Sequence, residues 1–287
     1  MSFAEKVYTA SVHRHLRNGS TTCVYFATIH EEASTLLAKI CIEAGQRAFV
    51  GKVNMDMMAP DFYVETTENS LRDTEAFITN VLELSNKRQG LVQPIITPRF
   101  AVTCSTELMK GLSQLAHKYD LAIQSHISEN KGEVQLIQRL HDEATYTHTY
   151  DASGLLTNKT LMAHGIFLSD RELQLLRERG TAVSHCPLSN FSLLSGVCDV
   201  RRLMNHGVKV CLGTDVSGGY SPSMLNSIRN TIIASSAQMA HHLHNYKQMD
   251  QMVQQFLEEA KTESTSADEQ QGEEEKYEPL VLSEAFY

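Results

Sequence analysis

Short apolar runs rich in β-branched residues alternate along the chain with longer segments of helical pattern. Some helical segments begin with a capping residue and end near a glycine, as Ser169 and Gly180 bound the helix predicted over 170–180. Further helices are predicted over 1–19, 31–45, 70–87, 105–120, 131–144 and 222–240. The apolar runs predict seven strands, over 21–29, 47–53, 93–98, 121–126, 160–164, 181–186 and 209–214.

The predicted strands are apolar on both faces and are separated by helices, which indicates a parallel sheet. Seven such units in a row are too many for a modest doubly wound sheet and nearly enough for a TIM barrel. We therefore predict an α/β fold over residues 1–240, an incomplete TIM (β/α)8 barrel with about seven of its eight strands.

The character of the sequence changes after the predicted barrel. Residues 241–260 are polar enough to form an exposed helix. The segment 261–287 is acidic, rich in Ser and Glu and nearly free of large apolar groups, so we expect a disordered tail. Its eight acidic residues and two lysines supply six of the nine net negative charges of the chain, which leaves the predicted barrel close to neutral.

The composition excludes several classes of protein. The apolar share of 42% and the charged share of 21% are ordinary for a globular domain. A net charge of −9 argues against binding to nucleic acid, and no apolar run of about 18 residues indicates a membrane helix. The six cysteines are scattered without a CxxC pair and the first residues do not resemble a signal peptide, so we expect a cytoplasmic protein.

Polar side chains end nearly every predicted strand in the second half of the pattern: Arg99, His126, His164, His185 and Asp215. Barrel enzymes place their chemistry at the face where the carboxyl ends of the strands meet, so we expect these side chains to lie together. A single strand-end histidine is more often structural than a ligand. Several in register are harder to explain in that way.

Histidine and aspartate together suit zinc or iron(II), and a divalent cation indicates hydrolysis by a metal-activated water. Glu129 lies three residues after His126, close enough for its carboxylate to move protons in the same cavity. An acid in this place also has a structural explanation, because acids are favoured in the first turn of a helix. Beside His126 we favour the catalytic interpretation.

The order and spacing of four motifs resemble the amidohydrolase superfamily of metal-dependent hydrolases: SHISEN (125–130), LMAHG (161–165), SHCPLSN (184–190) and GTDVSGGYSPSML (213–225). Four segments narrow the resemblance to the animal-type guanine deaminases: NGSTTCVYFATIH (18–30), GQRAFVGKVNMD (45–56), TPRF (97–100) and LLTNKTLMAHG (155–165). The resemblance covers residues 1 to about 240. It implies the zinc-dependent hydrolysis of guanine to xanthine and ammonia.

The resemblance implies roles for the residues that match its motifs. His126 and Asp215 would bind one zinc ion, and His126 would also lie near the purine. Asp215 would take a proton from the attacking water. His164 would stabilise the tetrahedral intermediate, and Glu129 would protonate the ring nitrogen and pass protons to the leaving amine.

The resemblance also implies how the base is recognised. Arg99 would donate hydrogen bonds to guanine, a suitable role for the planar and fixed donors of a guanidinium. Phe100 would cover the face of the base. The resemblance gives His185 no direct role, and we expect it to be structural or to support the site from behind.

Two further zinc ligands implied by the resemblance, an HxH pair on the first barrel strand, have no counterpart in this chain. His13 and His15 spell HxH within a predicted helix, where residues two apart point about 200° away from each other. His241, His242 and His244 follow the last predicted barrel helix with no apolar strand before them. We therefore expect the isolated chain to bind zinc poorly.

These expectations leave several interpretations open. The first is a truncated guanine deaminase of impaired activity, whether an isoform, a partial gene model or a degenerate copy. The second is a catalytically dead relative that acts by binding, as a homodimer or as a heterodimer with a full-length relative. A third is a deaminase of the same superfamily that acts on another purine or a triazine.

Overall fold

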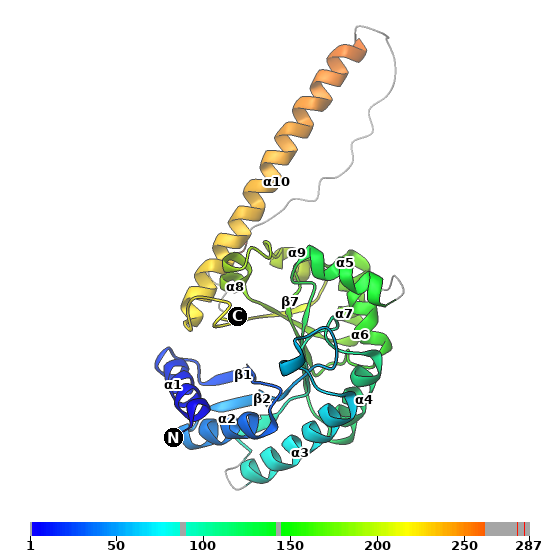
Figure 1. Cartoon of the computed structure of the whole chain (residues 1–287). Helices are drawn as coiled ribbons and strands as arrows, with labels where there is room; N and C mark the ends of the chain where they lie inside the picture. Colours follow the sequence, from blue (N-terminus) through cyan, green and yellow to red (C-terminus); the bar gives the residue numbers. More distant parts are fainter. Residues whose placement is uncertain (1, 87–89, 142–144, 262–279, 281–283, 285–287) are drawn as a thin grey trace.

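The computed structural model describes residues 2–86, 90–141, 145–261, 280 and 284 (Figure 1). Each of the seven predicted strand regions contains a strand, so the predicted α/β pattern is confirmed. Two regions are split into shorter strands. The strands are β1 (Thr22–Phe26), β2 (Arg47–Gly51), β3 (Val53–Asn54), β4 (Val92–Pro94), β5 (Thr97–Pro98), β6 (Ile123–Ile127), β7 (Thr160–His164), β8 (Ala182–His185) and β9 (Lys209–Leu212).

All the strand pairs are parallel, and neighbours in the sheets follow the order of the chain. The sheet orders are β1-β2-β4, β3-β5 and β6-β7-β8-β9. A parallel bridge between Ile96 and Ile123 joins the strands before β6 to the last sheet. Among the described residues, β1 pairs only with β2 and β9 only with β8, so these strands do not close a barrel.

β2 ends at Gly51, just before the break between β2 and β3, and neighbouring side chains leave no room there for a Cβ atom. A Cβ atom on Gly51 would lie 1.8 Å from Oγ1 of Thr97 and 2.7 Å from Nε2 of Gln124. No side chain fits in that space, so this strand end requires glycine.

The helices cover the strands from outside in an arc (Figure 1). The six helices predicted before the last strand are confirmed. They are α1 (Phe3–Arg17), α2 (Glu31–Ala44), α3 (Thr67–Asn86), α4 (Thr106–Lys118), α5 (Lys131–Leu140) and α7 (Asp170–Arg179). The main-chain N–H of Ser169 donates to Glu172 at 2.9 Å, and Gly180 ends α7 with φ of 70°. Both predicted boundaries of this helix are therefore present.

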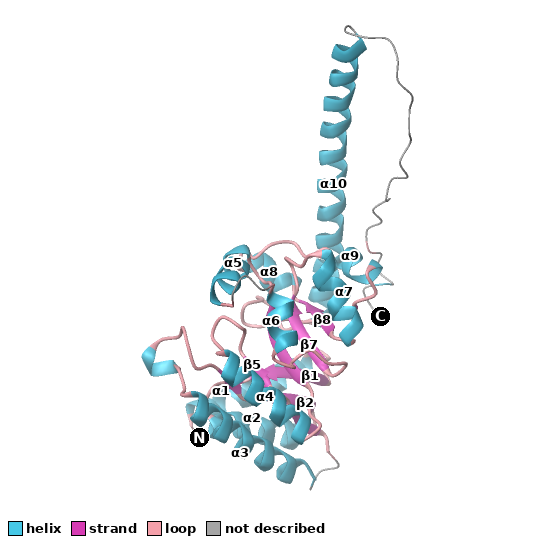
Figure 2. Ribbon diagram, turned by 90° about the vertical axis from the view of Figure 1, so that its right-hand side faces the viewer, coloured by secondary structure: helices cyan, strands magenta, loops and turns pink. Residues whose placement is uncertain are grey.

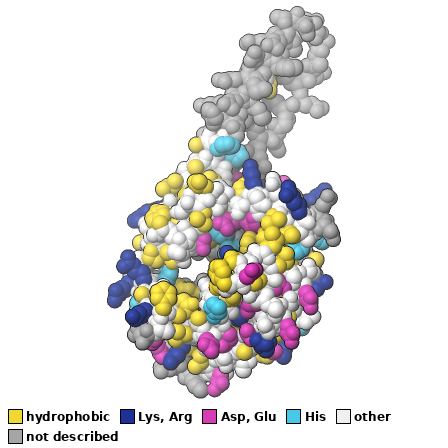
Figure 3. Space-filling view, viewed as in Figure 1, with side chains coloured by type: hydrophobic (Ala, Val, Ile, Leu, Met, Phe, Trp, Pro, Cys, Tyr) yellow, Lys and Arg dark blue, Asp and Glu magenta, His cyan; other side chains and the backbone are white. Residues whose placement is uncertain are grey.

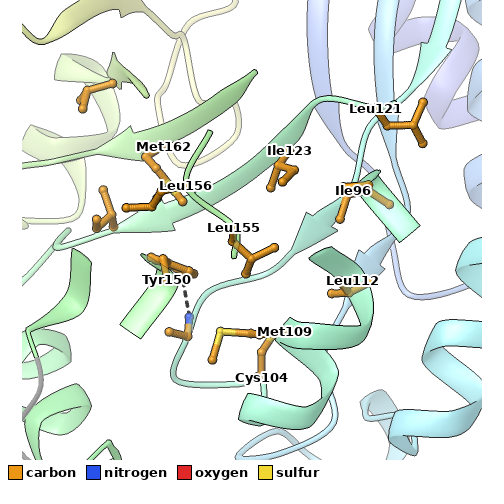
Figure 4. Close-up of a cluster of buried hydrophobic side chains, with 14 of the residues drawn as sticks. Ile96, Cys104, Met109, Leu112, Leu121, Ile123, Tyr150, Leu155, Leu156 and Met162 are labelled. Carbon is orange, nitrogen blue, oxygen red and sulfur yellow. Dashed lines mark hydrogen bonds between the residues drawn. The ribbon is translucent and has the colours of Figure 1, made fainter. Parts of the chain in front are cut away.

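Four short helical segments were not predicted: η1 (Asp61–Tyr63), α6 (Tyr146–Ala152), α8 (Pro187–Ser192) and α9 (Val200–Asn205). Their sequences are too short to show a helical repeat of apolar residues. Tyr146 and Tyr150 of α6 are nevertheless fully buried. Figure 4 shows Tyr150 within the core cluster, beside Leu155, Leu156 and Met162.

The last helix differs from the expectation. It is α10 (Met224–Lys261), which runs without a break through the boundary predicted at residue 240. Its far part extends away from the body of the protein in both views (Figures 1 and 2). No helix of the described chain is long and apolar enough to cross a membrane.

Most of the tail predicted over 261–287 lies outside the described residues. Two of its positions are described, and both contact the body. The main-chain N–H of Leu280 donates to Oγ of Ser235 on α10 at 2.7 Å, and Glu284 pairs with Arg201 on α9 at 2.8 Å. Leu280 is buried, so the tail is not free of the body at this point.

A buried ion pair lies at the break between β2 and β3. Nζ of Lys52 is 2.7 Å from Oε1 of Glu65, and the side chains are 0% and 9% exposed. The other oxygen of Glu65 accepts a hydrogen bond from Ser70 in α3. Burial lowers the pKa of Lys52, and Glu65 opposes this shift. The pair therefore links the strand region to the loop before α3.

Replacing Lys52 by methionine should lower the free energy of unfolding by about 3–5 kcal/mol, because it leaves the Glu65 carboxylate buried without its partner. Urea-induced unfolding would measure the change. The control is Lys159→Met, which removes an exposed pair with Asp120 and should cost less than about 1 kcal/mol. Equal losses in the two variants would contradict this account.

His185 is the last residue of β8 and shares a face of that strand with the core residue Val183. The ring is fully buried, and neither nitrogen has a hydrogen-bond partner among the described residues. Burial, and secondarily the nearby His164, lowers the pKa of His185 to about 3. The native protein therefore holds this histidine neutral.

This shift makes stability depend on pH. As pH falls from about 6.5 towards 3, His185 takes up a proton in the unfolded chain but not in the native one. The free energy of unfolding should therefore fall by up to about 1.4 kcal/mol per pH unit from this residue alone. His185→Phe should flatten the slope between pH 6.5 and 4.5 in urea titrations. The exposed His148→Phe should leave the slope unchanged, and equal slopes in all three proteins would count against the buried neutral state.

Candidate functional site

The predicted site residues follow the carboxyl ends of neighbouring parallel strands. Arg99 and Phe100 come directly after β5, His126 lies in β6, and His164 ends β7. Asp215 comes three residues after β9. In Figure 3 this face of the molecule has an opening, with histidine and acidic side chains at its margin.

His164 lies at the centre of the group. Its ring is 1% exposed, and its Nε2 atom is 3.6 Å from Oε2 of Glu129 and 3.9 Å from Oδ2 of Asp215. Its ring stacks on that of His126, with centroids 5.4 Å apart. The structure thus brings together four residues predicted from three separate strand ends.

The imidazole of His126 is held in one orientation. Its Nδ1 atom is 2.6 Å from the main-chain oxygen of Arg99, and the ring of Phe26 packs against it at 4.5 Å. Because a carbonyl oxygen only accepts, Nδ1 carries the proton and Nε2 keeps a free lone pair. Burial and the neighbouring His164 lower the pKa of His126. It is therefore a neutral imidazole, the form that binds metals.

Tyr150 of α6 fixes the main chain beneath His126. Its hydroxyl donates to the main-chain oxygen of His126 at 2.7 Å and accepts from the N–H of Ala101 at 2.9 Å. Oγ of Ser125 lies 2.9 Å from the same hydroxyl. One side chain thus holds the end of β6 against the loop that carries Arg99. Tyr150 could not be predicted from the sequence, because nothing in the polar segment of α6 indicated a buried helix.

Hydrogen bonds also position Glu129. Oγ of Ser195 donates to its Oε1 at 3.0 Å, and its own main-chain N–H donates to Glu133 at 3.1 Å. Glu133 also accepts from the hydroxyl of Tyr146, and burial raises its pKa. The second oxygen of Glu129 is left facing His164.

Arg99 is exposed and is held by apolar groups. Its Nη1 atom is 3.6 Å from the sulfur of Met55, and its guanidinium carbon lies 5.2 Å from the ring centroid of Phe100. No carboxylate of the described chain forms an ion pair with it. Its planar donors are available to a ligand that lies against Phe100.

Three residues around the site have left-handed main-chain conformations, which residues other than glycine rarely adopt. They are Ser128 (φ 49°), His164 (φ 76°) and Asp215 (φ 44°). Each such residue costs of order 1–3 kcal/mol, which the surrounding structure has to offset. The turns direct the strand-end side chains towards one another.

Two side chains of the group are of a type that binds zinc. The imidazole of His126 and the carboxylate of Asp215 are of the kind that zinc binds, and enzyme sites use three protein ligands. Among the described residues, however, no group of three His, Cys, Asp or Glu side chains is arranged to hold a metal. These residues do not form a complete zinc site by themselves.

The histidines that spell HxH in the sequence lie elsewhere in the chain. His15 is buried in α1, where its ring packs edge-on against Tyr25 at 5.9 Å. His13 lies at the exposed face of the same helix. His241 and His242 are exposed on α10, and the side chain of His244 lies outside the described residues.

Comparisons with known proteins agree with the expected resemblance. The model of the amidohydrolase family matches residues 1–253. The guanine deaminase of Dictyostelium discoideum is 51% identical over 236 residues, which are 82% of this chain and 52% of that protein. The guanine deaminase of Homo sapiens is 51% identical over 239 residues, with the same shares of the two chains. The chain therefore spans about half the length of these relatives.

A solved structure gives the same result for the fold. The guanine deaminase of C. acetobutylicum, solved with guanine in its active site, superposes with a TM-score of 0.80 at 40% identity. The match covers 84% of this chain and 57% of that one. Family match, sequence identity and fold agree, and the chain belongs to the amidohydrolase family.

Proposed function

We propose that this site serves the hydrolytic deamination of guanine to xanthine and ammonia. The observation that carries the proposal is the position of His164, whose Nε2 atom faces both Glu129 and Asp215. Two carboxylates and an imidazole within 4 Å can exchange protons with one bound molecule. The relatives named above supply the expected substrate.

In this proposal the base lies against Phe100, and Arg99 donates hydrogen bonds to its carbonyl edge. The cation–π contact between the two side chains keeps the guanidinium beside the ring that covers the base. Arg99 has no carboxylate partner among the described residues, so no ion pair has to break when guanine binds.

The residues around His164 then move the protons. Glu129 protonates the ring nitrogen beside C2, which makes this carbon more electrophilic. A water adds to C2 while Asp215 takes its proton. His164, when it carries a proton on Nε2, donates a hydrogen bond from that atom to the oxygen on which negative charge develops. Glu129, now a carboxylate, takes the proton of the new hydroxyl group and passes it to the amine. The carbon–nitrogen bond breaks as the C2 carbonyl forms, ammonia leaves, and the proton held by Asp215 returns to Glu129.

Zinc is the cofactor that the resemblance implies. The described chain offers two donors for it, His126 and Asp215, and no group of three. No step of the proposal therefore passes through a metal. The six free cysteines, four of them buried, support a reducing compartment such as the cytoplasm.

The incomplete donor set also favours a second candidate. A chain that cannot hold zinc could act by binding, as a homodimer or as a heterodimer with a full-length relative. Zinc content and turnover measured on one purified sample separate the two candidates. Zinc at one equivalent with turnover supports the enzyme, and a folded, zinc-free chain without turnover supports the binding protein.

The proposal predicts slow loss of guanine when the purified chain is incubated with zinc and followed by ultraviolet absorbance. Asp215→Ala should abolish this loss, because it removes the proposed proton acceptor. The control is Asp170→Ala, an exposed carboxylate on α7, which should leave the rate unchanged. Equal turnover in Asp215→Ala and the parent chain would contradict the proposal.

Arg99→Ala should lower kcat/KM for guanine about 10- to 100-fold, the effect of losing one or two hydrogen bonds from a charged donor. Because the guanidinium is exposed, the variant should unfold at the same urea concentration as the parent. Arg171→Ala, an exposed arginine on α7, is the matched control. If Arg99→Ala used guanine as well as the parent chain does, the base-recognition role would be wrong.

A further inference from the structure

One segment after β8 reaches two of the residues that move protons in the proposal. It consists of α8 and the turn that follows, residues 187–196. Oδ1 of Asn190 lies 2.9 Å from Nδ1 of His164. Oγ of Ser195 donates to Oε1 of Glu129 at 3.0 Å. His164 ends β7 and Glu129 follows β6, so the segment connects the ends of two different strands.

The main chain of the segment is built to present both side chains. The N–H of Asn190 donates to the oxygen of Cys186 at 3.0 Å, and the N–H of Ser195 donates to the oxygen of Asn190 at 2.9 Å. Asn190 is 1% exposed and Ser195 is 9% exposed. Both side chains are therefore enclosed, and their partners are fixed by the fold.

The turn between them is strained. Leu194 adopts a left-handed conformation with φ of 58°, and its side chain is 90% exposed. A leucine in this conformation costs of order 1–3 kcal/mol, and its own side chain gains nothing from burial. The turn brings the hydroxyl of Ser195 back towards Glu129.

We propose that Asn190 and Ser195 are positioning residues for the pair formed by His164 and Glu129. The amide oxygen of Asn190 accepts a hydrogen bond from Nδ1 of His164 and so fixes the ring with Nε2 towards the carboxylates. Ser195 occupies one oxygen of Glu129, so that the other lies 3.6 Å from Nε2 of His164. The effect of these two residues on turnover rests on the proposed function, whereas their effect on the geometry of His164 and Glu129 does not.

The geometric part can be measured without activity. The whole chain, labelled with ¹⁵N at histidine, is compared by NMR with Asn190→Leu and Ser195→Ala. We expect the parent to show a protonated Nδ1 at His164. Asn190→Leu should shift the Nδ1 resonance, and Ser195→Ala should shift Nε2 but not Nδ1. A parent spectrum with the proton on Nε2 alone, or resonances unchanged in both variants, would overturn the proposal.

Conservative variants separate positioning from a general structural role. Ser195→Thr keeps the hydroxyl and should restore the parent Nε2 resonance. Asn190→Asp keeps an acceptor but adds a charge, so it should keep Nδ1 protonated while shifting its resonance. If Asn190→Leu does not fold, Ser195→Ala removes a single oxygen and still tests the contact with Glu129. Loss of the Nδ1 proton in Asn190→Asp, or a Ser195→Thr spectrum that stays like that of Ser195→Ala, would also overturn the proposal.

Where turnover is present, the same variants divide kcat from KM. Asn190→Leu and Ser195→Ala should each lower kcat about 10- to 100-fold, as loss of a supporting hydrogen bond does in other sites. KM for guanine should change less than twofold, because Arg99 and Phe100 are untouched. Absence of turnover in the parent would count against the proposed function alone, since the NMR comparison still decides the positioning role.

Discussion

The parallel arrangement of the strands in chain order is the constraint on which the site depends. The parallel bridge between Ile96 and Ile123 joins the early strands to the later ones, and β6 to β9 then pair in sequence. The main-chain register places Ile127 beside His164 across β6 and β7. A slip by one residue would turn His164 to the opposite face of the sheet. The residues at the strand ends therefore come together as a site only when the strands pair in this register.

Register brings the residues to one place, and hydrogen bonds to main-chain and side-chain groups then orient their side chains. The carbonyl of Arg99 orients His126, the amide of Asn190 orients His164, and the hydroxyl of Ser195 orients Glu129. In each of these three hydrogen bonds, the orienting residue lies in a different segment of the chain from the residue that it orients. The orientation of these side chains thus depends on tertiary packing, which also offsets the energetic cost of the strained main-chain conformations at the strand ends.

This division explains what the sequence could predict. Strands and long helices show their own repeats, and strand-end residues such as His164 stand out because they interrupt apolar runs. Tyr150 and Ser195 have no such signal, since they lie in a short helix and a turn whose importance comes from what they contact. The helix predicted to end at residue 240 continues as α10 for a related reason. A change to polar composition indicated a new segment, yet polar residues also continue a helix that leaves the core, as α10 does.

The two parts of the site differ in how far the described chain completes them. His164 and Glu129, which handle protons together with Asp215 in the proposal, are the more enclosed, at 1% and 20% exposure, and both have side-chain partners. Asp215 is 35% exposed, and no third donor joins it and His126 within the described residues. The hydrogen bonds that orient His164 and Glu129 need no metal. The proton-handling geometry is therefore a property of the fold itself, whereas metal binding depends on donors that these residues do not supply.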